Sequence, residues 1–127
     1  MVAENHVGER IVAVTIHGIR VCDTIKKARS WLDANSIDHV FHDYKTQGIS
    51  EATLRGWVGQ VGWEVLLNRA GTTFRKLPGD ARDGLDKARA IRLMLAQPSM
   101  IKRPVLEADG ALLVGFRPDG YAAQFGR

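Results

Sequence analysis

The feature that most constrains the fold is a strand–helix–strand pattern near the start of the chain. Residues 11–16 read IVAVTI, a run of apolar and β-branched residues that predicts a buried strand. A helix is expected next, with Asp23 or Thr24 as its N-cap and Asn35 as its end. The apolar face of this helix consists of Ile25, Ala28 and Leu32. Residues 39–44, HVFHDY, alternate in polarity and predict a second strand, so the pattern indicates a parallel pair with a right-handed crossover.

The middle of the chain predicts several helices. Ser50 is a favourable N-cap, and helical spacing follows it in Leu54, Trp57, Val58 and Val61. Residues 63–67 predict a short second helix. Residues 75–84, RKLPGDARDG, have the composition of a loop. A third helix is expected to end before Pro98, with one face formed by Ala88, Ile91 and Leu95.

The last part of the chain predicts a β-hairpin. Residues 104–107 and 111–116 are apolar enough for two strands, and Asp109-Gly110 between them is a strong hairpin turn signal. After Pro118 we expect a short helix or a tail. The predicted fold class is therefore α/β, with a four-stranded mixed sheet that has a parallel and an antiparallel half. The thioredoxin fold has this order of elements, and the length predicts one domain over residues 1–127.

Composition excludes several classes of protein. A chain with 45% hydrophobic and 25% charged residues is typical of a globular protein, and 127 residues can bury a core without disulfides. One cysteine excludes an internal disulfide and a multi-thiolate metal site, and the four histidines have no metal-ligand spacing with it. The sequence shows no signal peptide and no apolar run long enough to span a membrane. We expect a cytoplasmic protein whose net charge of +4 suits small anions, with no metal and no direct binding of nucleic acid or membrane.

The single cysteine, Cys22, lies in the predicted loop between the first strand and the first helix. Free backbone N–H groups at a helix N-terminus favour an anion, so a thiol there can ionise below its usual pKa. Arg20, Lys26 and Lys27 would add positive potential, while Asp23 opposes them. The alternative is a small, buried and inert cysteine. A reactive Cys22 would need its resolving thiol from outside the chain, because Ile25 stands where a C-x-x-C pair would have its second cysteine.

Four segments carry a family resemblance, and together they extend over nearly all of residues 11–118. They read HGIRVCDTIKKARSWLDANSIDHVFHDYKTQGI, LLNRAGTTFRKL, LMLAQPSMIKRPVLE and LLVGFRP. In this order they resemble the arsenate reductase-like family of the thioredoxin superfamily, which holds the ArsC, Spx and YffB proteins. The chain is most similar to the YffB branch. The resemblance implies a thioredoxin-like fold with a helical insertion between the second and third strands.

The resemblance also implies a set of site residues. Cys22 matches the family's nucleophile, and Thr24 lies in the loop that surrounds its anionic partner. Arg103 matches an arginine beside the thiolate, and Pro104 matches a proline that faces the cysteine after a cis peptide bond. Arg117 matches a further arginine of the arsenate reductases. The catalytic pair would be Cys22 and Arg103, with Thr24, Pro104 and Arg117 at the substrate.

One position departs from the family. The arsenate reductases have an arginine directly after the "LL" of the middle helix, where this chain has Asn68, with Arg69 one residue later. On a helix, one residue turns a side chain by about 100°. Both residues are candidates for substrate binding, but the shift favours a glutathione-linked disulfide or another thiol substrate over arsenate.

The resemblance thus predicts a thiol-dependent reductase that acts on an oxyanion or a mixed disulfide. It would bind no resident cofactor, use glutathione as co-substrate and be resolved by glutathione or a glutaredoxin, and we expect a monomer. The alternative within the family is a Spx-like regulator that binds RNA polymerase without catalysis, although the C-x-x-C pair of the best-known Spx proteins is missing here. The third alternative is an inert structural domain.

Overall fold

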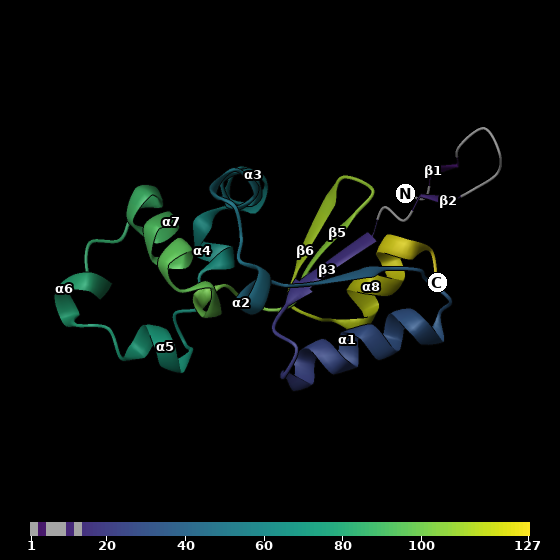
Figure 1. Ribbon diagram of the computed structural model, residues 1–127, viewed down its shortest axis with the longest axis horizontal. Coiled ribbons are helices and arrows are strands. Elements are labelled where there is room, and N and C mark those ends of the chain that lie inside the picture. Colours follow the sequence, from purple (N-terminus) through teal and green to yellow (C-terminus); the bar gives the residue numbers. More distant parts are fainter. Residues whose placement is uncertain (1–2, 5–9, 12–13) are drawn as a thin grey trace. The chain divides into compact units, whose positions relative to one another are not determined.

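The computed structural model describes residues 3–4, 10–11 and 14–127 of the chain. Its contacts separate two compact units (Figure 1). The first unit contains the residues up to Asp43 and those from Arg103 onward, and the second contains Tyr44–Lys102. That residues 1–127 act as one domain stays a prediction.

The first unit contains a four-stranded mixed sheet. Its strands are β3 (Val14–Gly18), β4 (Val40–Asp43), β5 (Val105–Ala108) and β6 (Ala111–Val114), in the order β4-β3-β5-β6. The β3–β4 pair is parallel, and the other two pairs are antiparallel. This is the predicted thioredoxin-like arrangement, with the helical segment inserted between the second and third strands of the sheet.

The first predicted strand is shifted along the chain. Strand β3 begins at Val14 and continues to Gly18, whereas Ile11 belongs to β2 (Arg10–Ile11), which pairs with β1 (Ala3–Glu4). The predicted strand residues 12–13 lie outside the described residues. A polar residue such as His17 can continue the strand because the backbone hydrogen bonds of β3 are made with β4 and β5 and do not depend on the side chain.

Two helices pack against one face of this sheet (Figure 1). They are α1 (Asp23–Ala34) and α8 (Pro118–Phe125). The core between them and the sheet consists of Val14, Ile16, Ala28, Leu32, Leu106, Ala108 and Tyr121. The predicted apolar face of α1 is buried, and the helix ends at Asn35 as predicted. Its N-cap is Cys22, so the prediction of Asp23 or Thr24 was wrong: the helix begins one residue earlier, with Asp23 in its first turn.

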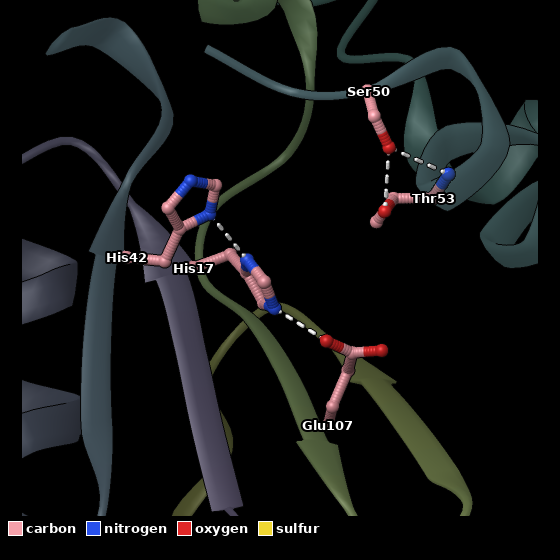
Figure 2. Close-up of polar contacts among 5 residues, drawn as sticks. All are labelled: His17, His42, Ser50, Thr53 and Glu107. Atoms are coloured by element: carbon pink, nitrogen blue, oxygen red, sulfur yellow. Dashed lines mark hydrogen bonds and ion pairs between the residues drawn. The ribbon is translucent and has the colours of Figure 1, made fainter. Parts of the chain in front are cut away.

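The opposite face of the sheet carries a polar cluster. The Nδ1 atoms of His17 and His42 lie 2.8 Å apart, and Nε2 of His17 lies 2.5 Å from Oε1 of Glu107 (Figure 2). These residues come from β3, β4 and β5, so the chain of contacts crosses three neighbouring strands. An ionised Glu107 only accepts hydrogen bonds, so His17 donates from Nε2.

The hairpin β5–β6 forms as predicted. Asp109 and Gly110 have φ values of 56° and 76°, and two consecutive positive φ values are typical of a type I′ hairpin turn. Both strands are displaced or shortened at their ends relative to the prediction, since β5 covers residues 105–108 and β6 covers 111–114. The chain after Pro118 forms the helix α8.

The second unit is helical. It contains α2 (Tyr44–Gln47), α3 (Glu51–Val61), α4 (Trp63–Leu66), α5 (Thr72–Arg75), α6 (Gly79–Arg82), α7 (Lys87–Ala96) and the 3-10 helix η1 (Pro98–Met100). Ser50 caps α3 as predicted: its hydroxyl accepts the N–H of Thr53 at 3.1 Å, and the two side chains also bond each other (Figure 2).

Two predictions for this unit were wrong in part. The expected loop over residues 75–84 contains the last residue of α5 and the single-turn helix α6, because its Gly and Pro residues limit helices there without excluding them. Helix α7 buries Ala90, Ile91 and Met94, whereas Ala88 is exposed. The buried face of the helix is therefore rotated relative to the predicted face. Alanine at either position 88 or 90 fits an apolar pattern, so the pattern alone could not distinguish them.

Candidate functional site

Cys22 lies at the N-terminus of α1. Its backbone is extended, with φ −154° and ψ 124°, and its carbonyl oxygen accepts the N–H of Lys26 at 3.1 Å as the first bond of the helix. The residue is half-buried. The N–H groups of the first helical turn have no partner within the helix. Cys22 is therefore placed where unpaired backbone donors begin.

These surroundings lower the pKa of the Cys22 thiol. Burial of the sulfur is the largest single influence and favours the neutral thiol. It is outweighed by the N–H of Ile25, the side chain of Arg103 and the N–H of Thr24, which hydrogen-bond to the thiolate, and by the charge of Arg103. These donors and the positive charge favour the thiolate over the neutral thiol.

Arg103 approaches from the start of β5. The Arg103–Pro104 peptide bond is cis, which confirms the prediction. Pro104 is buried, and its carbonyl oxygen accepts the N–H of Gly115 at 2.8 Å, which attaches this bend to the chain after β6. Arg103 is therefore held by backbone contacts of the sheet beside the cysteine loop.

Gly18 allows the parts of the site to come together. A Cβ atom built on Gly18 would lie 2.9 Å from Cγ1 of Ile25, closer still to its Cδ1, and 3.8 Å from Cβ of Arg103. The end of β3 therefore lies directly against the residue whose N–H faces the thiolate. Gly18 and the Ile25 N–H were not predicted as parts of the site, and a glycine at a strand end before a loop was the signal available for the first.

Thr24 and Arg117 lie in the same unit as Cys22. Thr24 is exposed and acts on the thiol through its backbone N–H. Arg117 is the N-cap of α8 and is exposed. It borders a hollow of about 170 Å³ lined by Leu113, Val114, Gly115, Arg117, Gly120 and Tyr121. Arg117 is not among the groups that change the pKa of Cys22.

Asn68 and Arg69 belong to the second unit. The N–H of Asn68 donates to the carbonyl oxygen of Met100 at 2.8 Å. Arg69 is exposed, and its guanidinium carbon lies 5.6 Å from the centre of the Trp63 ring. Both residues follow α4 and lie outside any helix, with Arg69 in a turn, so the rotation of about 100° per helical residue does not apply to them. Their role at the substrate stays a prediction.

Two further features bear on the chemistry of the described residues. Within residues 3–4, 10–11 and 14–127, no group of three or more His, Cys, Asp and Glu side chains could hold a metal ion. In the same part of the chain, every helix is too short or too polar to cross a membrane.

Comparison with known proteins decides the family. The model of the ArsC family matches residues 17–124, which include Cys22, Arg103 and Arg117. The chain belongs to the ArsC family. A Haemophilus influenzae protein described as uncharacterized is 40% identical over 112 residues, which are 88% of this chain and 98% of that protein.

Solved structures of family members have the same fold. A YffB protein is 58% identical, with a TM-score of 0.85 over 87% of this chain and 97% of that one. An arsenate reductase (ArsC) related protein from Brucella melitensis is 60% identical, with a TM-score of 0.73 over 91% of this chain and 96% of that one. More distantly, a Lactococcus lactis protein named global transcriptional regulator Spx 1 is 28% identical over 77% of both chains. The relatives thus include a YffB protein, an arsenate reductase related protein and a Spx regulator.

Proposed function

We propose that this ArsC family protein is a thiol-dependent reductase in which the Cys22 thiolate attacks a mixed disulfide of glutathione or a small oxyanion. The observation that supports this most is the lowered pKa of Cys22 at the N-terminus of α1, beside Arg103. A thiolate is the nucleophilic form of cysteine, so a site built for the anion favours covalent chemistry. In this proposal the protein works as a cytoplasmic monomer with glutathione or a glutaredoxin as its thiol partner.

With a mixed disulfide R–S–S–G, the reaction has two exchange steps. The Cys22 thiolate attacks the glutathione sulfur, the S–S bond breaks, and R–S⁻ leaves and takes up a proton. The thiolate of a second glutathione then attacks the Cys22–glutathione disulfide and releases oxidised glutathione and the Cys22 thiolate. Overall one glutathione thiol is consumed, and its sulfur leaves bonded to the glutathione sulfur of the substrate as oxidised glutathione. The external thiol is required because Cys22 is the only cysteine in the chain.

With an oxyanion, the same sulfur would bond to the central atom while one oxygen leaves as water. Attack of glutathione on the Cys22 sulfur would then return two electrons to the central atom and leave the same Cys22–glutathione disulfide. Arg103 would hold the negative charge beside the sulfur, and the Thr24 N–H would do so from the helix. Arg117 and Pro104, which lie in the same unit as Cys22, would contact the substrate.

The test is the alkylation rate of Cys22 by iodoacetamide as a function of pH. In the wild type we expect a pKa below that of an ordinary thiol, and in Arg103→Ala a higher one. Lys27→Ala is the matched control. It removes one positive charge from α1, but Lys27 is not among the groups that change the pKa of Cys22. Reduction of a glutathione mixed disulfide should need Cys22 and disappear in Cys22→Ser. An ordinary pKa in the wild type, with no turnover, would overturn the proposal.

A second candidate is a regulator that binds RNA polymerase without catalysis. The similarity to a protein named global transcriptional regulator Spx 1 favours it. Binding of RNA polymerase and reduction of a disulfide, both measured for the wild type and for Cys22→Ser, distinguish the two functions. A regulator of this kind should bind purified RNA polymerase and reduce no disulfide, whereas the reductase should show turnover that depends on Cys22 and no such binding.

A further inference from the structure

Strand β4 ends in a buried carboxylate. Asp43 is only 6% exposed, and among residues 14–127 the buried polar or charged residues are His17 and Asp43. Burial of a charged group costs free energy unless it is hydrogen-bonded. The burial of Asp43 therefore indicates that its carboxylate has a specific hydrogen-bonding role.

The register of the sheet places Asp43 beside the start of the cysteine loop. In the parallel β3–β4 pair, Asp43 is the partner of Gly18, the last residue of β3. From there its Oδ2 accepts the backbone N–H of Arg20 at 3.3 Å. The hydrogen bond thus attaches the loop to the sheet two residues before Cys22.

This segment of the loop has little packing to hold it. Arg20 is exposed, and Val21 is 86% exposed, so neither side chain contributes much buried area. Residues with few buried contacts are ordered mainly by their hydrogen bonds. The bond to Asp43 is therefore important for the path of the chain into Cys22.

The path matters because the thiolate is held by directional donors. The sulfur of Cys22 receives the N–H groups of Ile25 and Thr24 and the side chain of Arg103, and hydrogen bonds weaken steeply when they are misaligned. The carboxylate of Asp43 is not among the groups that change the pKa of Cys22. The hydrogen bond to the Arg20 N–H connects Asp43 to the thiol through the backbone of the loop.

We propose that Asp43 is a positioning residue for Cys22: its carboxylate oxygen holds the N–H of Arg20 and so fixes the loop that aligns the sulfur with its donors. The inference rests on the proposed function, since it concerns the same nucleophile. It assigns the effect to the oxygen acceptor. An asparagine, which keeps such an oxygen, should serve almost as well as aspartate.

The experiment compares Asp43→Ala and Asp43→Asn by the pH profile of Cys22 alkylation. We expect Asp43→Ala to raise the pKa of Cys22 by about half a unit or more, a loss of about three-fold in thiolate at a pH below both pKa values. Asp43→Asn should stay near the wild type. Asp38→Ala, at an exposed aspartate before β4, is the control for loss of charge and should also match the wild type.

A second pair of variants tests the proposal even if the Asp43→Ala protein does not fold. Arg20→Pro removes the N–H donor, since proline has none, and should raise the pKa of Cys22 as Asp43→Ala does. Arg20→Ala keeps the N–H and should not. An unchanged alkylation profile in both Asp43→Ala and Arg20→Pro would overturn the proposal. So would a lower pKa in both Asp43→Ala and Asp43→Asn, which would indicate an effect of charge.

The proposed function and the positioning role of Asp43 are tested by different measurements. It is tested by the wild type alone, through the pKa of Cys22 and the turnover of a glutathione mixed disulfide. The positioning role is tested by the difference between variants and wild type. A raised pKa in Asp43→Ala together with an inactive wild type would leave Asp43 as a positioning residue of a thiol that serves another purpose.

Discussion

Gly18→Ala is the substitution whose effect the structure determines most sharply. Gly18 is the last residue of β3 and is not among the glycines with a positive φ, so alanine fits its backbone. The obstacle is steric. The added Cβ would lie 2.9 Å from Cγ1 of Ile25 and closer still to its Cδ1, and Ile25 is only 1% exposed. Ile25 must therefore change rotamer in a packed core, or the start of α1 must move.

Two terms set the expected free energy. An extra methyl group forced into a packed core costs about 1–3 kcal/mol. Replacing glycine by alanine also restricts the unfolded chain, which stabilises by about 0.4–1 kcal/mol. We therefore expect the free energy of unfolding of Gly18→Ala to fall by about 1–2 kcal/mol. Because the N–H of Ile25 acts on the thiolate, its displacement should also raise the pKa of Cys22.

The matched control is Gly59→Ala, in the helix α3. A Cβ at Gly59 meets nothing within 4 Å, and alanine within a helix is more stable than glycine by roughly 0.5–1 kcal/mol. The two glycine-to-alanine changes should thus have opposite signs in urea denaturation. Iodoacetamide alkylation would follow the pKa of Cys22 in both, with no change expected in Gly59→Ala.

A double-mutant cycle isolates the contact. Ile25→Val removes Cδ1, the atom closest to the new Cβ, and should cost about 0.5–1.5 kcal/mol in the wild type. In the Gly18→Ala background it should cost less, because it removes the closer of the two contacts that the new Cβ makes with Ile25. The reasoning is refuted if Gly18→Ala is as stable as the wild type with an unchanged alkylation profile, or if the two substitutions are additive.

Three further predictions concern stability. Burial lowers the pKa of His17 below 6.5 although Glu107 raises it, so the unfolded chain binds more protons and the free energy of unfolding should fall as the pH drops below about 6.5. Urea titrations between about pH 5 and pH 7.5 test this, and His17→Gln should reduce the loss. Within the described residues the Tyr121 hydroxyl is buried without a hydrogen-bond partner, so Tyr121→Phe should stabilise by about 1 kcal/mol in urea denaturation, and a loss would contradict this. Ser50→Ala should cost about 1 kcal/mol by removing the cap of α3, which thermal unfolding would show as a lower Tm.

Local patterns in the sequence predicted much of the first unit. The apolar face of α1, the two strands around it and the Asp109–Gly110 turn depend on residues close together in the chain, so periodicity and turn chemistry suffice to find them. The same patterns misplaced the N-cap of α1 and missed α6. Helix ends depend on one or two backbone hydrogen bonds, and several residue types can provide a cap there.

The sequence by itself determined the position of the thiol, a single cysteine between a strand and a helix, and with it the need for an external thiol. Which charged side chain acts on that thiol was decided by tertiary structure. Among the cations close in sequence, Lys26 and Lys27 are not among the groups that act on Cys22, whereas Arg103 is. The reason is the sheet: antiparallel pairing of His17 with Val105 brings the start of β5 beside the end of β3, and parallel pairing of Gly18 with Asp43 brings a carboxylate to the loop. Such pairings join residues far apart in the chain, and no local pattern encodes them.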